Sequence, residues 1–352
     1  MKDEARSNMQ FIHNTDLDPG EDYLASVPRL QKVLRYPALL ETFNRYNHTA
    51  NRKQRVFRWT GTVSLWLGGA SLIGITLELL LAAFGLVVPR HVAVLVVLEF
   101  CAASSILFSL GPWLGQTRTQ WLAARFMTER IRQWHFQILL DGSLVSSAHK
   151  AGSEFESERD KRWAQFMTVA PNLEGAMRSF IDAESIDIHH PVMHFSDRAT
   201  AEQSFRAYED LRFQKQLSFF RLKREYFATR DDWSEAIARW LILSSLILVA
   251  GQLVVVISRH SADTPTSYSM FAAAIVLVIL SAIIRVYRSA LALSSQRDRY
   301  DAKWVRLVAL RTAYDRTTAV DKKLELMREV EAMEVEELRE FLRQLRRASY
   351  LL

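Results

Sequence analysis

The sequence is poor in cysteine, and this scarcity limits the kind of fold that it can adopt. Among its 352 residues there is a single cysteine, Cys101, so no intrachain disulfide can form and nothing indicates an oxidising compartment. The composition also avoids the extremes of disordered or wholly embedded chains, with 49% hydrophobic and 24% charged residues. Such a mixture predicts several membrane spans joined to a substantial polar portion.

Motifs for catalysis and for metal binding are missing as well. No GxxxxGK[ST], GxGxxG, GxSxG or HExxH pattern occurs, and the acidic and serine residues fall into no spacing that specifies a nucleophile and its base. We therefore predict neither enzyme activity nor a cofactor. His189, His190 and His194 surround Pro191, but their spacing fits no standard ligand pattern and no cysteine is near, so a polar loop is the favoured explanation and we predict no metal site.

Charge is nearly absent from two long apolar stretches. Thr60–Val88 holds 29 residues with Glu78 as its one charge, and Val92–Leu114 holds 23 with Glu99 as its one charge. A helix of about 20 apolar residues crosses the hydrocarbon of a bilayer, where every backbone polar group has to be bonded internally. The pattern predicts two spans, at 60–88 and 92–114, folded back on each other at the turn 88–91.

A second, shorter pair of apolar stretches follows. The third predicted span is Trp240–Ile257, with Gln252 as its most polar member, and the fourth is Tyr268–Tyr287. Arg285 and Arg288 lie at the end of the fourth and can extend to the interface. The sequence thus predicts an all-α integral membrane protein with four transmembrane helices, arranged as two hairpins with extended cytoplasmic helices.

Two acidic residues lie at similar depth in the first hairpin. Glu78 precedes Pro89 by 11 residues and Glu99 follows it by 10, which places each carboxylate about 15 Å from the turn. A charge at that depth costs about 2.5–3.5 kcal/mol on insertion scales, so both acids should face protein or water. Ser64, Gly68 and Ser71 share a helix side with Glu78, and such small residues let a neighbouring helix approach closely.

Two interpretations of these acids remain open. Each can be protonated and hydrogen-bonded inside a packed bundle, since burial raises the pKa of a carboxyl group. Alternatively, Glu78 and Glu99 line a path for cations or protons, with Gln252 as the polar counterpart in the second hairpin. Both interpretations require a partner surface for the first hairpin.

The basic residues gather beside the apolar stretches, which favours membrane orientation over nucleic-acid binding as the explanation of the net charge of +6. Each predicted hairpin tip carries one arginine, Arg90 or Arg259, whereas the other flanks carry several basic residues. This asymmetry predicts a multi-pass protein of the inner (plasma) membrane with both termini in the cytoplasm. The residues expected to anchor the helices at the interface are Arg58, Trp121, Arg125, Arg285 and Trp304.

The pattern along the chain suggests five consecutive segments. They are a cytoplasmic N-terminal tail and helix (1–50, interrupted near Pro37), the first two-span unit (51–140), a cytoplasmic helical linker region (141–215), the second two-span unit (216–315) and a C-terminal charged helix (316–352). Within the third segment, 141–158 is rich in Ser, Gly and Ala and is expected to be a loop. In the last, Val335, Leu338, Leu342 and Leu345 form an apolar seam, for which packing on its own chain is favoured over intermolecular coiling.

A short motif follows the first predicted hairpin directly. The run Trp121-Leu122-Ala123-Ala124-Arg125-Phe126-Met127-Thr128-Glu129-Arg130 resembles the SLATT family, the SMODS/SLOG-associated two-transmembrane effector domain. The similarity is best over about 45–140 and looser over 215–315, where Trp304-Val305-Arg306 follows the second hairpin. The resemblance is therefore compatible with two tandem copies.

The resemblance implies a bacterial membrane effector. Such a protein oligomerises and permeabilises the inner membrane, or forms a pore in it, when triggered in anti-phage defence or a toxin-like conflict system. The implied partners are the lipid bilayer, further copies of the chain and a separate cytoplasmic sensor or nucleotide-signalling protein; no nucleic acid is expected. The alternative is a non-conducting membrane anchor or scaffold that recruits a soluble defence or signalling complex.

Overall fold

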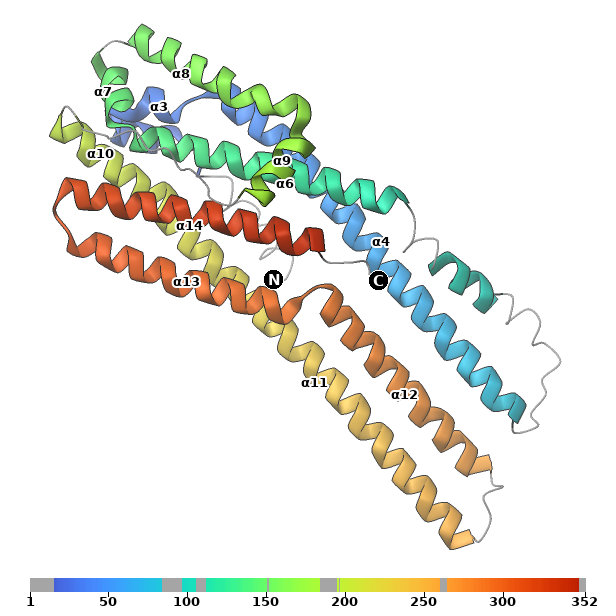
Figure 1. Ribbon diagram of the computed structural model, residues 1–352. Helices are drawn as coiled ribbons and strands as arrows, with labels where there is room; N and C mark the ends of the chain where they lie inside the picture. Colours follow the sequence, from blue (N-terminus) through green and yellow to red (C-terminus); the bar gives the residue numbers. More distant parts are fainter. Residues whose placement is uncertain are drawn as a thin grey trace. The chain divides into compact units, whose positions relative to one another are not determined.

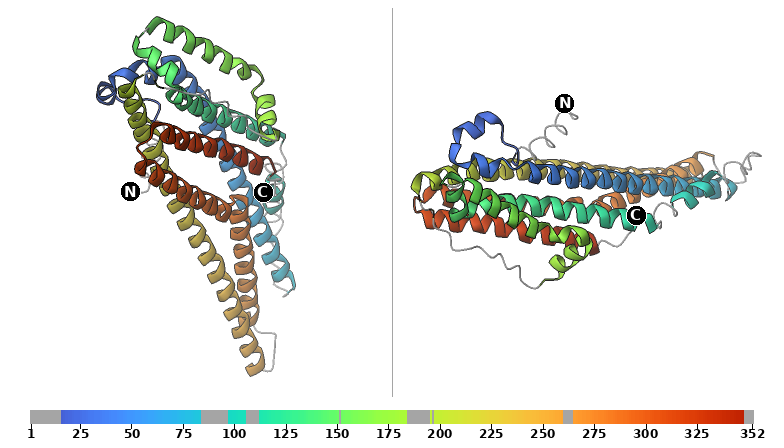
Figure 2. Two further views of the ribbon diagram at one scale, coloured as in Figure 1. Left: turned by 60° about the vertical axis from the view of Figure 1, so that its left-hand side comes forward. Right: turned by 90° about the horizontal axis from the view of Figure 1, so that it is seen from above.

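The computed structural model describes residues 16–83, 97–105, 112–150, 152–183, 195, 197–259 and 265–347, and all regular structure among them is helical (Figures 1 and 2). The prediction of an all-α protein is confirmed. The elements are α2 (Glu21–Ser26), η1 (Pro28–Leu30), α3 (Gln31–Leu34), α4 (Pro37–Ala83), α6 (Pro112–Leu140), α7 (Gly142–Lys150), α8 (Gly152–Phe166), η2 (Met167–Asn172), α9 (Leu173–Asp182), α10 (Arg198–Tyr208), η3 (Glu209–Phe213), α11 (Gln214–Arg259), α12 (Pro265–Ala290), α13 (Leu293–Arg316) and α14 (Val320–Arg347). Residues 97–105 form a further short helix.

Three helical stretches are long and apolar enough to cross a membrane, namely Pro37–Glu78, Arg198–Ser258 and Ser269–Arg316. They indicate a multi-pass membrane protein. The predicted span 240–257 lies within the second of these stretches, and the predicted span 268–287 lies within the third except for its first residue.

The first predicted hairpin is described in part. Its first arm, 60–88, is helical as far as Ala83. Of the second arm, 92–114, the structure describes 97–105 and the start of α6. The turn 88–91 and the three histidines near Pro191 lie outside the described residues.

The chain divides into two compact units, each drawn from stretches that are far apart in sequence. Unit 1 consists of Met1–Gln54, Arg118–Lys223 and Arg299–Ser349, and unit 2 of Arg55–Thr117, Arg224–Asp298 and Tyr350–Leu352. The five consecutive segments expected along the chain stay a prediction, because the units are defined by packing rather than by sequence order.

Unit 1 contains a core rich in aromatic rings. Phe136 on α6 packs edge-on against Tyr208 on α10, with ring centroids 6.0 Å apart, and Phe213 lies 5.3 Å from Tyr314 on α13. All four side chains are buried, and burying a large apolar side chain stabilises a fold by about 1.5–3 kcal/mol. The part of α13 in unit 1 lies beside α14 (Figures 1 and 2), joined to it by the ion pair of Lys303 with Glu337.

The apolar seam of α14 packs on its own chain, as predicted. Val335, Leu338 and Leu342 are buried in unit 1, and α14 contacts both α9 and α10. This helix therefore uses its apolar side within the fold rather than for intermolecular coiling.

The prediction of a loop at 141–158 is wrong, because this stretch forms α7 and the beginning of α8. The side chain of Asp141 accepts hydrogen bonds from the backbone N–H of Leu144 (3.0 Å) and the hydroxyl of Ser143 (2.6 Å). An aspartate in this position satisfies N–H groups that the first helical turn leaves unbonded. The helices also bury Val145 and Phe155, so capping and burial outweigh the weak helix propensity of Ser and Gly.

Two helix boundaries have clear local causes. Pro37 is the first residue of α4, where its missing N–H is harmless and its fixed φ suits the helix; the break predicted there is confirmed. Between α12 and α13, Ala292 adopts φ 47°, the left-handed conformation in which helices often end.

Candidate functional site

Small polar residues on α4 form a close contact with the helix 97–105 in unit 2. The hydroxyl of Ser64 donates to the carbonyl of Ser105 (2.9 Å), and the hydroxyl of Ser105 donates back to the carbonyl of Ser64 (2.8 Å). Ser71 donates to the carbonyl of Leu98 (2.9 Å). A Cβ atom on Gly68 would lie 2.8 Å from the Ser105 hydroxyl, so a larger residue there would require that hydroxyl to move. The structure therefore places the three small residues singled out in the sequence at one helix–helix contact.

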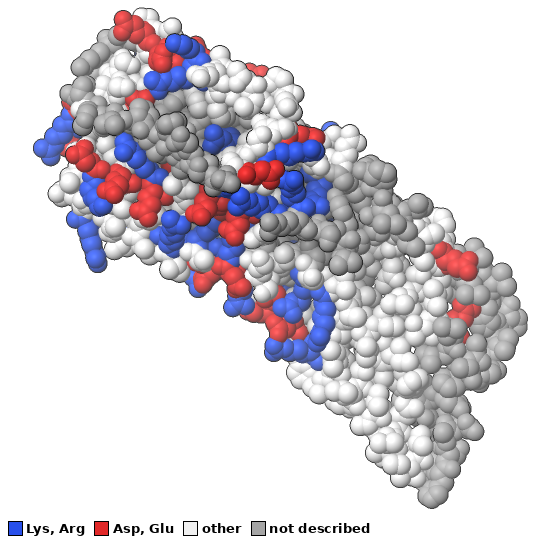
Figure 3. Space-filling view, viewed as in Figure 1, with Lys and Arg blue, Asp and Glu red and all other residues white. Residues whose placement is uncertain are grey.

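The two acids of this hairpin differ in exposure. Glu78 on α4 is half-buried, whereas Glu99 is exposed on the helix 97–105. Its neighbours Val97 and Phe100 are 59% and 72% exposed. Figure 3 shows acidic atoms within a part of the surface whose other described residues are uncharged. A carboxylate on such an apolar surface is costly in contact with lipid.

The second pair of helices, α11 and α12, is held by one polar contact and one close approach. Ser281 is buried and donates to the carbonyl of Ala238 (3.0 Å). A Cβ atom on Gly251 would lie 2.7 Å from the terminal methyl of Met270. Gln252, the polar residue predicted for this hairpin, is half-buried on α11. The outward faces are apolar, with Trp240, Leu246, Ile247, Leu253, Val254 and Ile257 exposed.

A charged cluster lies where α11 and α12 meet just outside the predicted spans. The guanidinium of Arg288 pairs with Asp231 (2.7 Å) and Glu235 (3.1 Å), and Arg297 pairs with Asp232 (2.9 Å). Asp231 is buried, so its negative charge is held by the arginine beside it. Sequence reasoning missed this cluster, although the spacing of Asp231 and Glu235, four residues apart on one helix face, was a visible signal.

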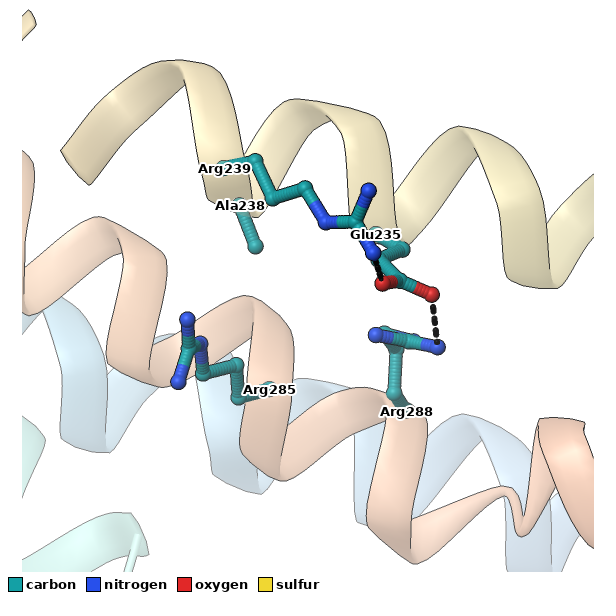
Figure 4. Close-up of a pocket in the computed structure, with 5 residues that line it drawn as sticks. All are labelled: Glu235, Ala238, Arg239, Arg285 and Arg288. Atoms are coloured by element: carbon teal, nitrogen blue, oxygen red, sulfur yellow. Dashed lines mark hydrogen bonds and ion pairs between the residues drawn. The ribbon is translucent and has the colours of Figure 1, made fainter. Parts of the chain in front are cut away.

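A cavity of about 260 Å³ adjoins this cluster and is lined by Glu235, Ala238, Arg239, Arg285 and Arg288 (Figure 4). Glu235 forms ion pairs with both Arg239 and Arg288. Arg285 is exposed, and among the residues that the structure describes no side chain forms an ion pair or hydrogen bond with it. The lining thus has more positive than negative charge.

Unit 1 contains charged residues in its interior. Arg212, in the π-helical turn η3, forms two hydrogen bonds with Glu331 on α14 (2.8 and 3.1 Å), and both residues are buried. The hydroxyl of Tyr208 also donates to Glu331 (2.8 Å). Burial and the neighbouring Glu331 carboxylate together raise the pKa of Tyr208 well above its ordinary value, so this side chain stays protonated and donates.

Two further buried groups of unit 1 have shifted acid–base properties. Burial and, to a smaller extent, the nearby Arg212 lower the pKa of His135 to about 4. Burial also lowers the pKa of Lys303 to about 7, against the attraction of Glu334; the Lys303 ammonium lies 2.5 Å from Glu337. Neither His135 nor Lys303 could be singled out from the sequence, because the shift in the pKa of each side chain depends on burial by helices that are distant along the chain.

The expected interfacial anchors lie in different surroundings. Arg58 and Arg285 are exposed in unit 2. In unit 1, Trp121 is buried edge-on against Phe341 (6.4 Å), Arg125 forms an ion pair with Glu129, and Trp304 is half-buried against the core. Trp121 therefore makes packing contacts inside unit 1, and the anchoring role of the exposed arginines stays a prediction.

The described part of the chain contains no group of three or more His, Cys, Asp or Glu side chains placed to hold a metal ion. No protein-family model, curated protein or solved structure matches this chain. The function of the chain is therefore inferred from the geometry of its long apolar helices and from the resemblance noted in the sequence.

Proposed function

We propose that the chain is a bacterial membrane effector whose copies associate in the inner membrane and permeabilise it. The observation that supports this function is the exposed carboxylate of Glu99 on an apolar helix. In contact with lipid, the charge costs about 2.5–3.5 kcal/mol on insertion scales. A second copy of the chain, or a water-filled path between copies, provides an environment without that cost.

The arrangement in two hairpins is supported by the composition of unit 1. Its three stretches pack together, with Arg29 paired to Asp197 and Arg212 to Glu331. A folded polar body of this kind lies on one side of a bilayer. The chain between residues 54 and 118 then crosses an even number of times, as does the chain between 223 and 299. Since α4 supplies one crossing, a second follows it, in keeping with the span predicted at 92–114.

Several copies are needed to enclose a path. A bundle of four helices leaves little room between them, and channels are lined by rings of equivalent groups from several subunits. In such an assembly Glu78, Glu99 and Gln252 would line the path, while unit 1 would receive the trigger from a separate cytoplasmic sensor. The resemblance to the SLATT family favours anti-phage defence or another conflict system as the setting.

The test is to remove the acids without changing side-chain size. In liposomes containing the full chain, Glu99→Gln and the double variant Glu78→Gln with Glu99→Gln should lower cation leak about tenfold, a change in barrier of about 1.4 kcal/mol. Toxicity on expression should fall in parallel. Glu329→Gln, which neutralises an exposed acid on α14, is the matched control and should leave leak unchanged.

The same experiment separates this function from that of a non-conducting anchor. Unchanged leak and toxicity in the double variant, at normal membrane insertion, would contradict a conducting role for the acids. An anchor would in addition keep its activity when its spans are replaced by unrelated apolar helices, an outcome that a pore does not permit.

A further inference from the structure

The cavity between α11 and α12 lies at the level where the apolar surface of both helices ends. Arg239 immediately precedes the predicted span 240–257, and Arg285 lies two residues before the end of the predicted span 268–287. A membrane helix places its flanking arginines at the headgroup level, with the guanidinium extended toward water. The lining of the cavity therefore faces the layer that contains lipid phosphates.

The charges in the cavity are unbalanced. Glu235 is shared between Arg239 and Arg288, and Arg288 is further held by the buried Asp231. Figure 4 shows the Arg285 side chain next to these groups without a dashed line to any of them. Arg285 thus contributes a positive charge that no carboxylate of the lining neutralises.

We propose that this cavity binds a phosphate-bearing anion, with Arg285 as its principal contact and Arg239 as its second. Guanidinium groups bind phosphate oxygens through paired, charge-assisted hydrogen bonds. The volume of about 260 Å³ lies just below the range of about 300–1,000 Å³ that is typical of sites for drug-sized ligands. It suits a single phosphate group with its immediate substituents.

The phosphate has two possible sources, a lipid headgroup or a free phosphate ion. The position at the end of the spans favours the lipid, because anionic headgroups concentrate at this surface and attract basic residues near it. The site is independent of conduction: it uses none of Glu78, Glu99 and Gln252. It can therefore exist whether or not the proposed function is correct.

The test measures the thermal stabilisation of the full-length protein in neutral detergent. Dioleoylphosphatidylglycerol, dioleoylphosphatidylcholine and inorganic phosphate are titrated in separate arms. We expect phosphatidylglycerol to stabilise the protein and phosphatidylcholine to do so weakly. Stabilisation by inorganic phosphate alone would identify the free ion as the source and retain the site.

The variants assign the effect to the cavity. Arg285→Gln should weaken phosphatidylglycerol binding about tenfold, and Arg285→Lys should recover part of the loss because it keeps the charge but not the paired geometry. Arg58→Gln is the matched control, since it removes one exposed flanking charge from a different helix. Arg285 is exposed, so its replacement should leave the folding of the apo protein intact, as its unfolding temperature without lipid will show.

Three results would overturn the site. They are equal stabilisation by phosphatidylcholine and phosphatidylglycerol, no stabilisation by either phosphatidylglycerol or inorganic phosphate, and equal losses in Arg285→Gln and Arg58→Gln. The last result would mean that the lipid responds to overall charge rather than to this cavity.

Discussion

At the scale of single residues, the buried charges of unit 1 are neutralised by ion pairs, several of which join distant parts of the chain. Arg212 and Glu331 are 119 residues apart in sequence, and Arg132 pairs with both Asp16 and Glu129. Removing one partner of such a pair leaves an uncompensated buried charge, which is strongly destabilising. His135, next to these charges, is instead kept neutral.

The neutral state of His135 predicts acid sensitivity of unit 1. Its pKa is about 4 in the fold against an ordinary 6.5, so as pH falls below 6.5 the unfolded chain takes up a proton that the folded chain does not. The histidine has no effect above the ordinary pKa, and the fold loses stability progressively as pH falls from about 6.5 toward 4. The loss from this residue between pH 7 and 5 is about 2 kcal/mol.

The variant His135→Gln isolates this contribution, because glutamine does not titrate. We expect its free energy of unfolding to fall less than that of the unmodified protein between pH 7 and pH 5, whatever its value at pH 7. Denaturant unfolding followed by tryptophan fluorescence measures the free energy of unfolding of both proteins. Trp134 and Trp163, with ring centroids 5.0 Å apart and packed against the core of unit 1, are suitable reporters. Identical pH dependence in the two proteins would show that His135 is not buried as a neutral group.

The residues that could be singled out from the sequence are those whose signal is local. Glu78 and Glu99 were evident because each is the single charge in a long apolar stretch, and Ser64, Gly68 and Ser71 because they recur at helical spacing. The pairing of Arg212 with Glu331 gave no such signal. Its energy comes from a contact that exists only after α10, η3 and α14 have packed.

At the scale of elements, the long helices were predictable and their short connections were not. The apolar stretches of α4, α11 and α12 each hold about 18 residues or more with few charges, and this combination of length and composition marks them as candidate spans. By contrast, α7 begins in a stretch whose Ser and Gly content favours a loop, and the capping carboxylate of Asp141 was the one local signal for a helix start. Arg162, which pairs with Asp141 at 2.7 Å, adds support from the next helix.

The junction of α12 and α13 yields a prediction of its own. Ala292 is exposed and has φ 47°, a conformation that costs a residue with a Cβ atom roughly 1–2 kcal/mol. Glycine adopts it freely but loses more entropy on folding, by roughly 0.5–1 kcal/mol. Ala292→Gly should therefore stabilise the chain modestly, by up to about 1 kcal/mol.

A bulkier substitution at the same position provides the control for this junction. Ala292→Val places a branched side chain in the same conformation and should lower the unfolding temperature, while Ala302→Gly, at an exposed position inside α13, should destabilise by about 1 kcal/mol. Unfolding temperatures of the four proteins in one detergent make the comparison. Destabilisation by Ala292→Gly equal to that by Ala302→Gly would mean that residue 292 is helical.

At the scale of the whole molecule, connectivity constrains the topology more tightly than hydropathy does. Three described helices are apolar enough to span, and three crossings alone would put the two ends of the chain on opposite sides. The packing of unit 1, which includes residues from before, between and after the apolar stretches, instead favours the even number of crossings that we propose. The sequence predicted the two hairpins from paired apolar stretches and their orientation from charge, but it could not reveal that their polar flanks assemble into one folded body.

We therefore expect single cysteines on the two sides of the membrane to react differently. In a Cys101→Ala background, Ser261→Cys, between the third and fourth predicted spans, should be labelled in intact cells by a membrane-impermeant maleimide. Ser147→Cys on α7 and Ala302→Cys on α13 should be labelled after permeabilisation only, since both belong to unit 1 and to the cytoplasmic side predicted by the basic flanks. Labelling of Ser147→Cys and Ala302→Cys from opposite sides would require an odd number of crossings between them. A packed unit 1 does not permit an odd number of crossings, because all of its parts lie on one side of the membrane. Labelling from opposite sides would therefore contradict the existence of unit 1 as one folded body, and not only the orientation of the chain.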